Sequence, residues 1–332
     1  MANQEYKLSD TSGFDSLKLH KSSIPQPNPG EIQIKFHACS LNYRDLIISK
    51  GLYPLPMKIN IVPTSDGAGE ITAVGEGVTH LKIGDPLSSA LGGALDGCLR
   101  QYGNFRALSC VKIPTSLSYE EAATLPCAAL TAWNALYGVS DRALKPGQTV
   151  LVQGTGGVSL FGAQFALAAG AKVILTSSSN KKIDATKAHL GEKNVMTINY
   201  SEVPEWGKRA KELTDGRGVD HILEVGGANT LKQSIEALAM NGSIHVIGFL
   251  GQGNGSDMTV SELVMNALMK NAFIRGVLIG SVEQFKAMNA AIEANNIKPI
   301  INKIFEFEDV KSAYEYQWSQ QHVGKVVIQI PQ

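Results

Sequence analysis

A glycine-rich segment is the part of the chain whose residue types point most directly to chemistry. It reads Gly154-Thr155-Gly156-Gly157-Val158-Ser159, between an apolar run at 150–152 and a small-residue apolar run at 158–169. Glycines here allow a tight strand-to-helix turn and a close backbone approach to phosphate, and the first N–H groups of a helix bind anions. The segment therefore predicts a pyrophosphate site and redox chemistry with a dinucleotide. An ordinary glycine-rich turn is the alternative, and Ser159 stands where a third glycine is usual.

The residues that follow favour the dinucleotide interpretation, because expected strands and helices alternate. Strands are expected at 172–176, 195–199, 219–225, 243–247 and 273–278, and helices at 181–190, 205–213, 231–240 and 261–270, the last capped by Ser261. This order predicts a doubly wound α/β domain with a parallel six-stranded sheet. Ligands bind outside the carboxyl ends of such strands, which is where Gly154, Gly226 and Gly248 fall.

The first 120 residues differ in kind from this domain. Segments 31–38 and 67–74 alternate apolar and polar residues, and turns rich in proline and glycine flank them. Short strands with many turn residues predict an antiparallel, barrel-like domain. The tail after residue 279 contains one expected helix, 282–295, and a strand, 324–330, which we expect to return to the first domain.

Composition excludes several classes of protein. The 332 residues include 30 basic and 30 acidic side chains, so nothing favours binding to nucleic acid or to a membrane surface. No apolar run approaches the roughly 20 residues that span a bilayer, and the N-terminus lacks the shape of a signal peptide. Cys39, Cys98, Cys110 and Cys127 form no CxxC pair, which favours a reducing, cytoplasmic location.

Several motifs together resemble those of the medium-chain dehydrogenase/reductase superfamily, in its alcohol-dehydrogenase-like and quinone-oxidoreductase-like branches. They are the glycine turn and segments 42–45, 51–54, 65–70, 75–78, 122–126, 131–133 and 324–327. The resemblance implies a GroES-like antiparallel β-barrel catalytic domain, residues 1–125 and 280–332, around a Rossmann NADP-binding domain, residues 126–279. It also implies an active site in the cleft between them, and a homodimer formed through the edge strand at 273–277.

Zinc divides this superfamily. In zinc-bearing relatives the catalytic ligands are a Cys, a His and a second Cys, and the matching positions here are Asn42, Ser65 and Cys127. Asn and Ser are poor zinc ligands, and a single thiolate does not hold the metal. The relatives' four-cysteine lobe is also missing, since only Cys98 and Cys110 fall between residues 87 and 111. We therefore predict no metal site and interpret Cys127 as a small buried hydrophobe.

A reductase without zinc must polarise its substrate by hydrogen bonds and take a proton from a side chain or from water. The catalytic candidates are Tyr53, Asn42 and Arg44, with Tyr43 as a further hydroxyl. By resemblance, Tyr53 matches a tyrosine that faces the nicotinamide in zinc-free relatives. The alternatives are that Tyr53 packs at a loop edge, and that Arg44 and its neighbour Asp45 are structural.

The end of the second expected strand bears on the choice of cofactor. NAD sites usually place Asp or Glu there, whereas this chain has Thr176-Ser177-Ser178-Ser179-Asn180-Lys181-Lys182. Hydroxyls and lysines suit the 2′-phosphate of NADPH, and by resemblance Tyr200 lies beside that phosphate. Helix capping by the serines is the alternative. The expected cofactor contacts are Asn42, Thr131, Gly154, Thr155, Gly156, Gly157, Val158, Ser177, Ser178, Lys182, Tyr200, Gly248 and Phe249.

These observations predict an NADPH-dependent, zinc-independent oxidoreductase that transfers hydride to a quinone, an enone or another reactive carbonyl compound. An alcohol dehydrogenase or aldehyde reductase of the same superfamily is one alternative. The other is an NADPH-binding sensor with little turnover, which the lack of an obvious acid–base pair favours slightly. The expected partners are a small-molecule substrate and a second copy of the chain, and the sequence does not name the substrate.

Overall fold

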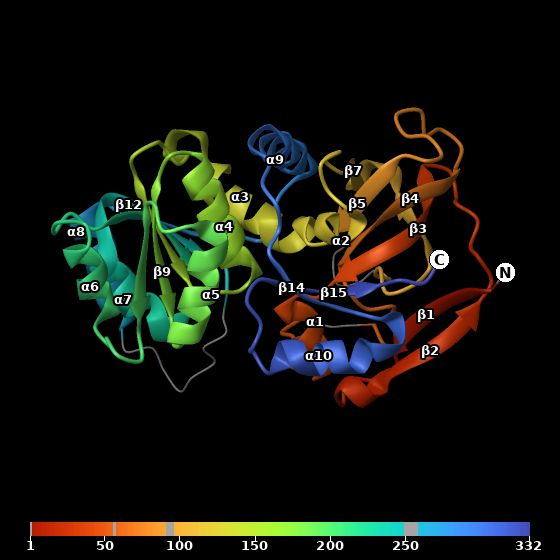
Figure 1. Ribbon diagram of the computed structural model, residues 1–332, viewed down its shortest axis with the longest axis horizontal. Coiled ribbons are helices and arrows are strands. Elements are labelled where there is room, and N and C mark those ends of the chain that lie inside the picture. The colour runs from red at the N-terminus through yellow and green to blue at the C-terminus, as the bar shows by residue number, and fades with distance from the viewer. Residues whose placement is uncertain (1, 56–57, 91–95, 249–257) are drawn as a thin grey trace. The chain divides into compact units, whose positions relative to one another are not determined.

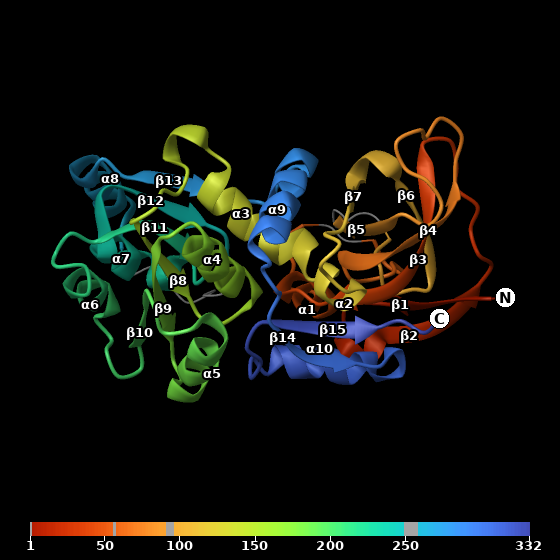
Figure 2. The same cartoon turned by 45° about the horizontal axis from the view of Figure 1, so that its top comes forward.

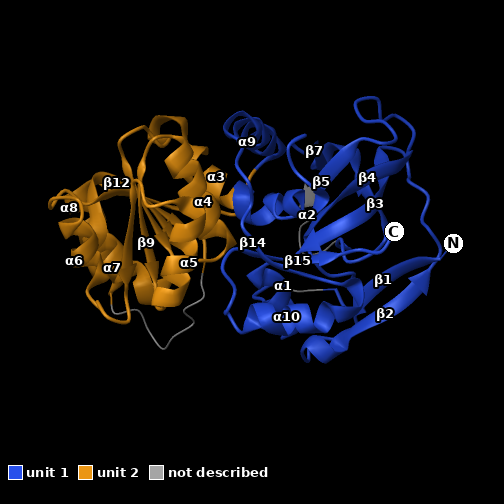
Figure 3. Ribbon diagram, viewed as in Figure 1, with its two compact units in different colours: residues 1–130, 281–332 blue, residues 131–280 orange. Residues whose placement is uncertain are grey.

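Two compact units make up the protein in the computed structural model, which describes residues 2–55, 58–90, 96–248 and 258–332 (Figures 1 and 3). Unit 1 comprises residues 1–130 and 281–332, and unit 2 comprises residues 131–280. The first division falls at 130/131 rather than at the expected 125/126. Residues 125–130 belong to unit 1, where the backbone N–H of Cys127 donates to the buried carboxylate of Asp66.

A six-stranded parallel sheet forms the centre of unit 2. Its strands are β8 (Thr149–Gln153), β9 (Lys172–Ser177), β10 (Val195–Asn199), β11 (Val219–Glu224), β12 (Leu238–Val246) and β13 (Phe273–Gly276). They lie in the order β10-β9-β8-β11-β12-β13, and every neighbouring pair is parallel. The predicted doubly wound sheet is confirmed. Strand order reverses beside β8, and such a switch point is where open α/β sheets bind ligands.

Helices cover both faces of this sheet (Figure 2). They are α4 (Gly157–Ala168), α5 (Asn180–Leu190), α6 (Trp206–Glu212), α7 (Ala228–Ala237) and α8 (Val260–Lys270), while α3 (Leu130–Tyr137) enters the unit. Trp206, Ile235 and Leu263, from α6, α7 and α8, belong to one apolar cluster with Ile222 and Ile244 of the sheet. These three helices therefore share a face, and α4 and α5 lie on the other (Figure 2).

Two predicted helix boundaries are wrong. The helix expected at 231–240 is α7, Ala228–Ala237, because Leu238 is buried in the sheet and already pairs with Val219. Asn241, with φ 61, is an irregularity inside β12 and does not end a helix. The cap of α8 is Thr259 rather than Ser261, since its hydroxyl accepts from the N–H of Glu262 in a capping box.

A mostly antiparallel sheet organises unit 1. Its strands are β3 (Glu31–Ser40), β4 (Asp66–Val74), β5 (Pro86–Ala90), β6 (Tyr102–Arg106), β7 (Cys110–Lys112), β14 (Ile301–Phe305) and β15 (Lys325–Gln329). The order is β14-β15-β3-β4-β5-β7, β6 pairs with β3, and only β14 and β15 are parallel neighbours. The predicted return of the last strand to the first domain is confirmed, because β15 pairs with β3. Strands β1 (Asn3–Leu8) and β2 (Leu17–Ser22) form a separate ribbon.

Short helices complete unit 1. They are α1 (Tyr43–Ser49), α2 (Tyr119–Ala122), α9 (Val282–Asn295), α10 (Val310–Trp318) and a π-helical turn, η3 (Leu125–Ala129). Single 3-10 turns are η1 (Phe14–Ser16), η2 (Ala107–Ser109) and η5 (Phe307–Asp309) here, and η4 (Ser140–Arg142) in unit 2. No helix among the described residues is long and apolar enough to cross a membrane.

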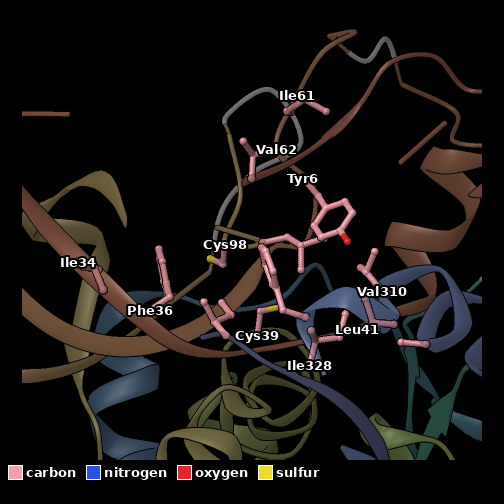
Figure 4. Packing of buried hydrophobic residues seen from close by; sticks show 14 of the residues in the cluster. Tyr6, Ile34, Phe36, Cys39, Leu41, Ile61, Val62, Cys98, Val310 and Ile328 are labelled. Carbon is pink, nitrogen blue, oxygen red and sulfur yellow. The ribbon is translucent and has the colours of Figure 1, made fainter. Parts of the chain in front are cut away.

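The hydrophobic core of unit 1 includes the residues at the carboxyl end of β3. Cys39 and Leu41 pack there with Ile328 of β15 and Val310 of α10, and all four are buried (Figure 4). Burial of this kind contributes about 25 cal/mol for each Å² of apolar surface removed from water. The residue that follows this packed strand end, Asn42, is therefore held on a rigid support.

Candidate functional site

The turn between β8 and α4 has the geometry of a phosphate cradle. Gly154 has φ +76, a left-handed conformation that glycine adopts without strain. Gly156 precedes α4 in extended conformation, and no side chain caps that helix. A Cβ on either glycine would meet no described atom within 4 Å. Open space above unprotected helix N–H groups fits the pyrophosphate of NAD(P).

Ser159, which stands at the usual position of the third glycine, has a structural role of its own. Its hydroxyl donates to the carbonyl oxygen of Gln153 at 2.6 Å, so the serine ties the start of α4 to the end of β8. Close helix–sheet packing comes instead from Gly162, where a Cβ would lie 2.4 Å from a methyl group of Leu223. Sequence reasoning missed this role of Gly162, although its position about one helical turn after Ser159 was the available signal.

A buried polar network closes the carboxyl ends of β8 and β11. The Gln153 amide donates to Glu224 Oε2 at 2.7 Å and to Ser234 Oγ at 2.9 Å. Its oxygen accepts from the N–H groups of Val225 and Gly226, at 3.1 and 3.0 Å. This end of the sheet is therefore rigid before any ligand binds.

Two further predicted cofactor residues of unit 2 are described by the structure, Gly248 after β12 and Thr131 in α3. A Cβ on Gly248 would lie 2.2 Å from the carbonyl oxygen of Val225, so no other residue fits there without a shift. Thr131 is buried at the start of α3. Phe249 lies outside the described residues.

The residues predicted to hold a 2′-phosphate gather at the ends of β9 and β10. Ser179 is the cap of α5, since its Oγ accepts from the N–H of Lys182 at 3.4 Å, so capping does not explain Ser177 and Ser178. Ser177 is buried, Ser178 is exposed, and the N–H of Tyr200 donates to the Ser177 carbonyl at 3.0 Å. Burial lowers the pKa of the Lys182 ammonium. The four predicted residues, Ser177, Ser178, Lys182 and Tyr200, therefore lie around the ends of these two strands.

A carboxylate that sequence reasoning missed lies at the same place. Glu202 follows β10, and its Oε1 accepts from Asn180 at 2.6 Å and from Asn199 at 3.0 Å. Asn180 is the first residue of α5. The search for a carboxylate covered only the end of β9, although Glu202 lies two residues after Tyr200, which was predicted at this place. Its charge opposes a 2′-phosphate.

In unit 1, the three positions that match the zinc ligands of relatives lie together. The Asn42 amide nitrogen lies 3.4 Å from Ser65 Oγ, and the Ser65 hydroxyl donates to Asp66 Oδ1 at 2.7 Å. Asp66 Oδ2 accepts from the backbone N–H of Cys127 at 3.0 Å. Hydrogen bonds therefore connect the positions that a metal would connect.

A buried lysine that sequence reasoning missed joins this network. Lys325 opens β15 and is 4% exposed, and its Nζ lies 2.6 Å from Asn42 Oδ1 and 2.6 Å from the carbonyl oxygen of Leu41. An ammonium only donates, so the amide oxygen of Asn42 faces Lys325 and its nitrogen faces Ser65. A lysine at the start of a mostly apolar strand was the available signal. We call Asn42, Ser65, Asp66, Lys325 and the Cys127 backbone the polar centre.

Burial dominates the electrostatics of the polar centre. It raises the pKa of Asp66 and lowers the pKa of Lys325, and each charge opposes the shift of the other. Cys127 is partly exposed rather than buried as predicted, yet loss of hydration around its sulfur still raises the pKa of the thiol to about 12, so the thiol stays protonated. No group of three His, Cys, Asp or Glu side chains among the described residues could hold a metal ion. An amide, a hydroxyl and an ammonium do not fit zinc.

The backbone before Ser65 is strained. Thr64 has φ 63, which is uncommon for a β-branched residue and costs on the order of 1–3 kcal/mol. The N–H of Cys98 donates to the Thr64 carbonyl at 2.8 Å, and a Cβ on Gly97 would lie 2.0 Å from that oxygen. The backbone of residues 97–98 therefore packs closely against Thr64, which requires glycine at position 97, and the hydrogen bond from Cys98 helps to hold the Thr64 backbone before Ser65.

Tyr53 and Arg44 form a second group in unit 1. The guanidinium carbon of Arg44 lies 5.4 Å from the centre of the Tyr53 ring, and Tyr53 is half-buried. Burial disfavours the Arg44 charge, but Asp45 and the Tyr53 hydroxyl outweigh it and raise the pKa of Arg44. No hydrogen bond between described residues joins Tyr53 to Asn42. Tyr43 instead stacks on Trp318, with ring centres 6.2 Å apart.

Two protein-family models match parts of the chain. Residues 157–294 match the family model described as a zinc-binding dehydrogenase. Residues 28–115 match the model of the alcohol dehydrogenase GroES-like domain.

Individual proteins match over almost the full length. A zinc-type alcohol dehydrogenase-like protein of Schizosaccharomyces pombe is 49% identical, and the match covers 97% of each chain. A solved structure of an NAD-dependent alcohol dehydrogenase is 26% identical with a TM-score of 0.89, covering 99% of this chain and 100% of that one. A mycobacterial quinone oxidoreductase is 27% identical with a TM-score of 0.82, covering 98% and 99%.

Proposed function

The chain belongs to the medium-chain dehydrogenase/reductase superfamily and is an oxidoreductase of that family, and we propose that it is an NADPH-dependent, zinc-independent reductase of quinones, enones or other reactive carbonyl compounds. The polar centre carries this proposal. Asn42 and Ser65 stand at two metal-ligand positions and are hydrogen-bonded to a lysine and an aspartate instead. Such a site polarises an oxygen by hydrogen bonds rather than by a Lewis acid.

NADPH, when bound, supplies a hydride. We propose that the turn of Gly154, Thr155, Gly156, Gly157 and Val158 holds its pyrophosphate, where the structure leaves both open space and free helix N–H groups. Ser177, Ser178, Lys182 and Tyr200 would hold the 2′-phosphate, with Glu202 working against it. Asn42, Thr131, Gly248 and Phe249 remain predicted contacts.

Tyr53 is the proposed hydrogen-bond or proton donor to the substrate, and Asn42 is the second donor. The guanidinium of Arg44 lies beside the Tyr53 ring, and this cation–π contact helps to hold the ring that carries the proposed donor hydroxyl. Tyr53→Phe and Asn42→Ala should each lower kcat by about 10²-fold, with smaller effects on NADPH affinity. Near-full kcat in both variants would assign the proton to water or to the cofactor ribose.

A substrate panel tests the proposal. Purified protein is mixed with NADPH or NADH and with quinones, enones and aldehydes, and cofactor oxidation is followed by absorbance. We expect turnover of quinones or enones, and a preference for NADPH of roughly tenfold or more, since a paired phosphate is worth about 1.5–3 kcal/mol. Lys182→Ala should weaken NADPH alone. Turnover of aldehydes only would favour an alcohol dehydrogenase, and binding without turnover would favour a sensor.

Metal analysis tests the other half of the proposal. Protein dialysed without chelator should carry no stoichiometric zinc, because the ligand set at residues 42, 65 and 127 is unsuitable. About one tightly held zinc per chain would contradict this.

We also propose a homodimer in the cytoplasm. Strand β13 is the last strand of its sheet, so its outer edge has no partner among the described strands. On the adjacent α8, Val260, Val264 and Leu268 are 79%, 59% and 71% exposed and follow one another at helical spacing. An isologous contact would cover both features. Light scattering should show a dimer at micromolar concentration, and Val264→Lys should shift it to monomer.

A further inference from the structure

Lys325 has no part in the reaction proposed above, yet it lies within the polar centre. Its side chain is almost fully buried, and a buried ammonium is unfavourable unless its surroundings compensate it. Two carbonyl-type oxygens lie within hydrogen-bond distance of Nζ, from Leu41 and Asn42. This arrangement fixes a positive charge beside the residue that stands at the first metal-ligand position.

The backbone around Lys325 leaves little freedom for its position. Gly324 has φ +88, and a Cβ there would lie 2.2 Å from the carbonyl oxygen of Ile300. The N–H of Lys325 donates to the same oxygen at 2.9 Å. Strand β15 also lies between β14 and β3. The ammonium is therefore held by a sheet interior rather than by a mobile loop.

The charge of Lys325 is balanced at a distance but not cancelled by contact. Asp66, the largest influence that stabilises the ammonium, is hydrogen-bonded to Ser65 and to the Cys127 N–H. No described carboxylate oxygen lies within 4.0 Å of Lys325 Nζ. A cation without a contact ion keeps its field available for another anion.

The hydrogen-bond count of Lys325 is also incomplete. An ammonium has three N–H donors, and Leu41 and Asn42 use two of them. No described residue accepts the third. One charged donor is thus available at the place where relatives hold a metal.

We propose that the third N–H of Lys325 donates to the substrate oxygen on which negative charge develops, so that this ammonium takes the electrostatic role of the metal. The inference rests on the proposed function. Hydride adds to the substrate carbon, the displaced electron pair moves to the oxygen, and a proton from solvent or Tyr53 completes the product. Lys325 keeps its own proton throughout.

The test uses an oxyanion probe, because binding can be measured without turnover. 4-Nitrophenolate, a planar aromatic oxyanion, is titrated into the full-length protein with saturating NADP⁺ and followed by its absorbance. Lys325→Met should bind the phenolate at least tenfold more weakly than the native protein, whereas Lys325→Arg should stay within about threefold. Lys303→Met, on the exposed side of β14, is the matched control and should change nothing.

NADP⁺ affinity and thermal melting are measured on the same variants. NADP⁺ affinity should be nearly unchanged in Lys325→Met. The melting temperature should fall, because the buried Asp66 loses its counter-charge, and the titration is run at a temperature where melting shows the variant to be folded. Lys325→Gln replaces the methionine variant if that variant does not fold. Equal phenolate binding with and without the ammonium overturns the inference, as does a native protein that binds no phenolate. Loss of NADP⁺ affinity equal to the loss of phenolate affinity overturns it too, because Lys325 would then act on the cofactor.

The same titration separates this inference from the proposed function. If phenolate binding depends on Lys325 but the protein oxidises no NADPH with any substrate, the inference about Lys325 is supported and the proposed reductase function is rejected. In an active enzyme, Lys325→Met should lower kcat by about 10²-fold and leave the KM for NADPH nearly unchanged.

Discussion

The glycine turn of unit 2 and the polar centre of unit 1 are built in opposite ways. The turn lies within residues 153–159 and offers backbone N–H groups, so its geometry depends on which positions lack side chains. The polar centre draws side chains from three separate segments and a backbone N–H from a fourth, and Asn42 and Lys325 are 283 positions apart. A backbone site is sensitive to added atoms, whereas a side-chain site is sensitive to lost partners. The predictions below test this difference.

Removing the Asp66 carboxylate should have the largest effect on stability. Asp66→Ala leaves the Ser65 hydroxyl, the Cys127 N–H and the Lys325 charge without their acceptor or counter-charge. The free energy of unfolding, measured by urea denaturation at pH 7, should fall by about 3 kcal/mol. Asp10→Ala, an exposed carboxylate that also accepts from serine, is the control and should cost far less. Adding Lys325→Met to Asp66→Ala should recover part of the lost free energy of unfolding. If the effects of the two substitutions on this free energy simply add, the two charges are not coupled.

Adding a side chain to the glycine turn should abolish cofactor binding without unfolding the protein. Gly156 has an ordinary backbone conformation and the Cβ of Gly156→Val meets no described atom within 4 Å, so we expect the variant to fold. The valine occupies the space proposed for phosphate, and NADPH affinity should fall by about 100-fold, or about 2.7 kcal/mol. Calorimetric titration measures the affinity, and thermal melting is the control. Unchanged affinity would place the pyrophosphate elsewhere.

Acid should weaken unit 2 through two buried histidines. His221 Nδ1 lies 3.2 Å from His245 Nε2, and burial lowers their pKa values to about 4 and about 3. Both stay neutral in the folded state, while the unfolded chain takes up protons near pH 6.5. Stability should therefore be full above pH 6.5 and fall as pH decreases toward 4, by at most about 1.4 kcal/mol per pH unit for each histidine.

Urea denaturation between pH 7 and 5 measures this dependence. Replacing both histidines by glutamine should flatten the profile in that range, and His189→Gln, on the surface helix α5, should not. An unaltered profile in the double variant would assign the acid sensitivity to other groups.

The smallest effect should come from Glu202. Its carboxylate lies beside the first residue of α5 and opposes the proposed 2′-phosphate. Glu202→Gln keeps hydrogen bonding and removes the charge, so the NADPH-to-NADH preference should rise about threefold, worth about 0.6 kcal/mol at an exposed site. The ratio of the two Kd values measures it. A rise in NADH affinity instead would mean that Glu202 acts on the ribose.

Sequence reasoning succeeded where the signal is local and failed where the fold creates the neighbourhood. The alternation of strands and helices predicted the parallel sheet of unit 2, and the glycine spacing located its turn, because both patterns lie within short windows. Lys325 was missed because it reaches its site from a strand 283 positions away. Glu202 was missed because the carboxylate was sought only at the end of β9, and the pairing of β9 with β10 brings it to the same corner. The end of α7 was misplaced because burial of Leu238 in the sheet overrides its helix propensity.

The π-helical turn at Leu125–Ala129 has a consequence for how this protein tolerates change. Cys127 joins the polar centre through its main-chain N–H, so any amino acid except proline can supply this donor at position 127. A π turn accommodates one residue more than an α-helix would in the same span. Deleting a single residue between 125 and 129 would rotate that N–H away from Asp66. A scan of substitutions would therefore find position 127 more permissive than its buried neighbours, while a scan of deletions would find the whole turn essential.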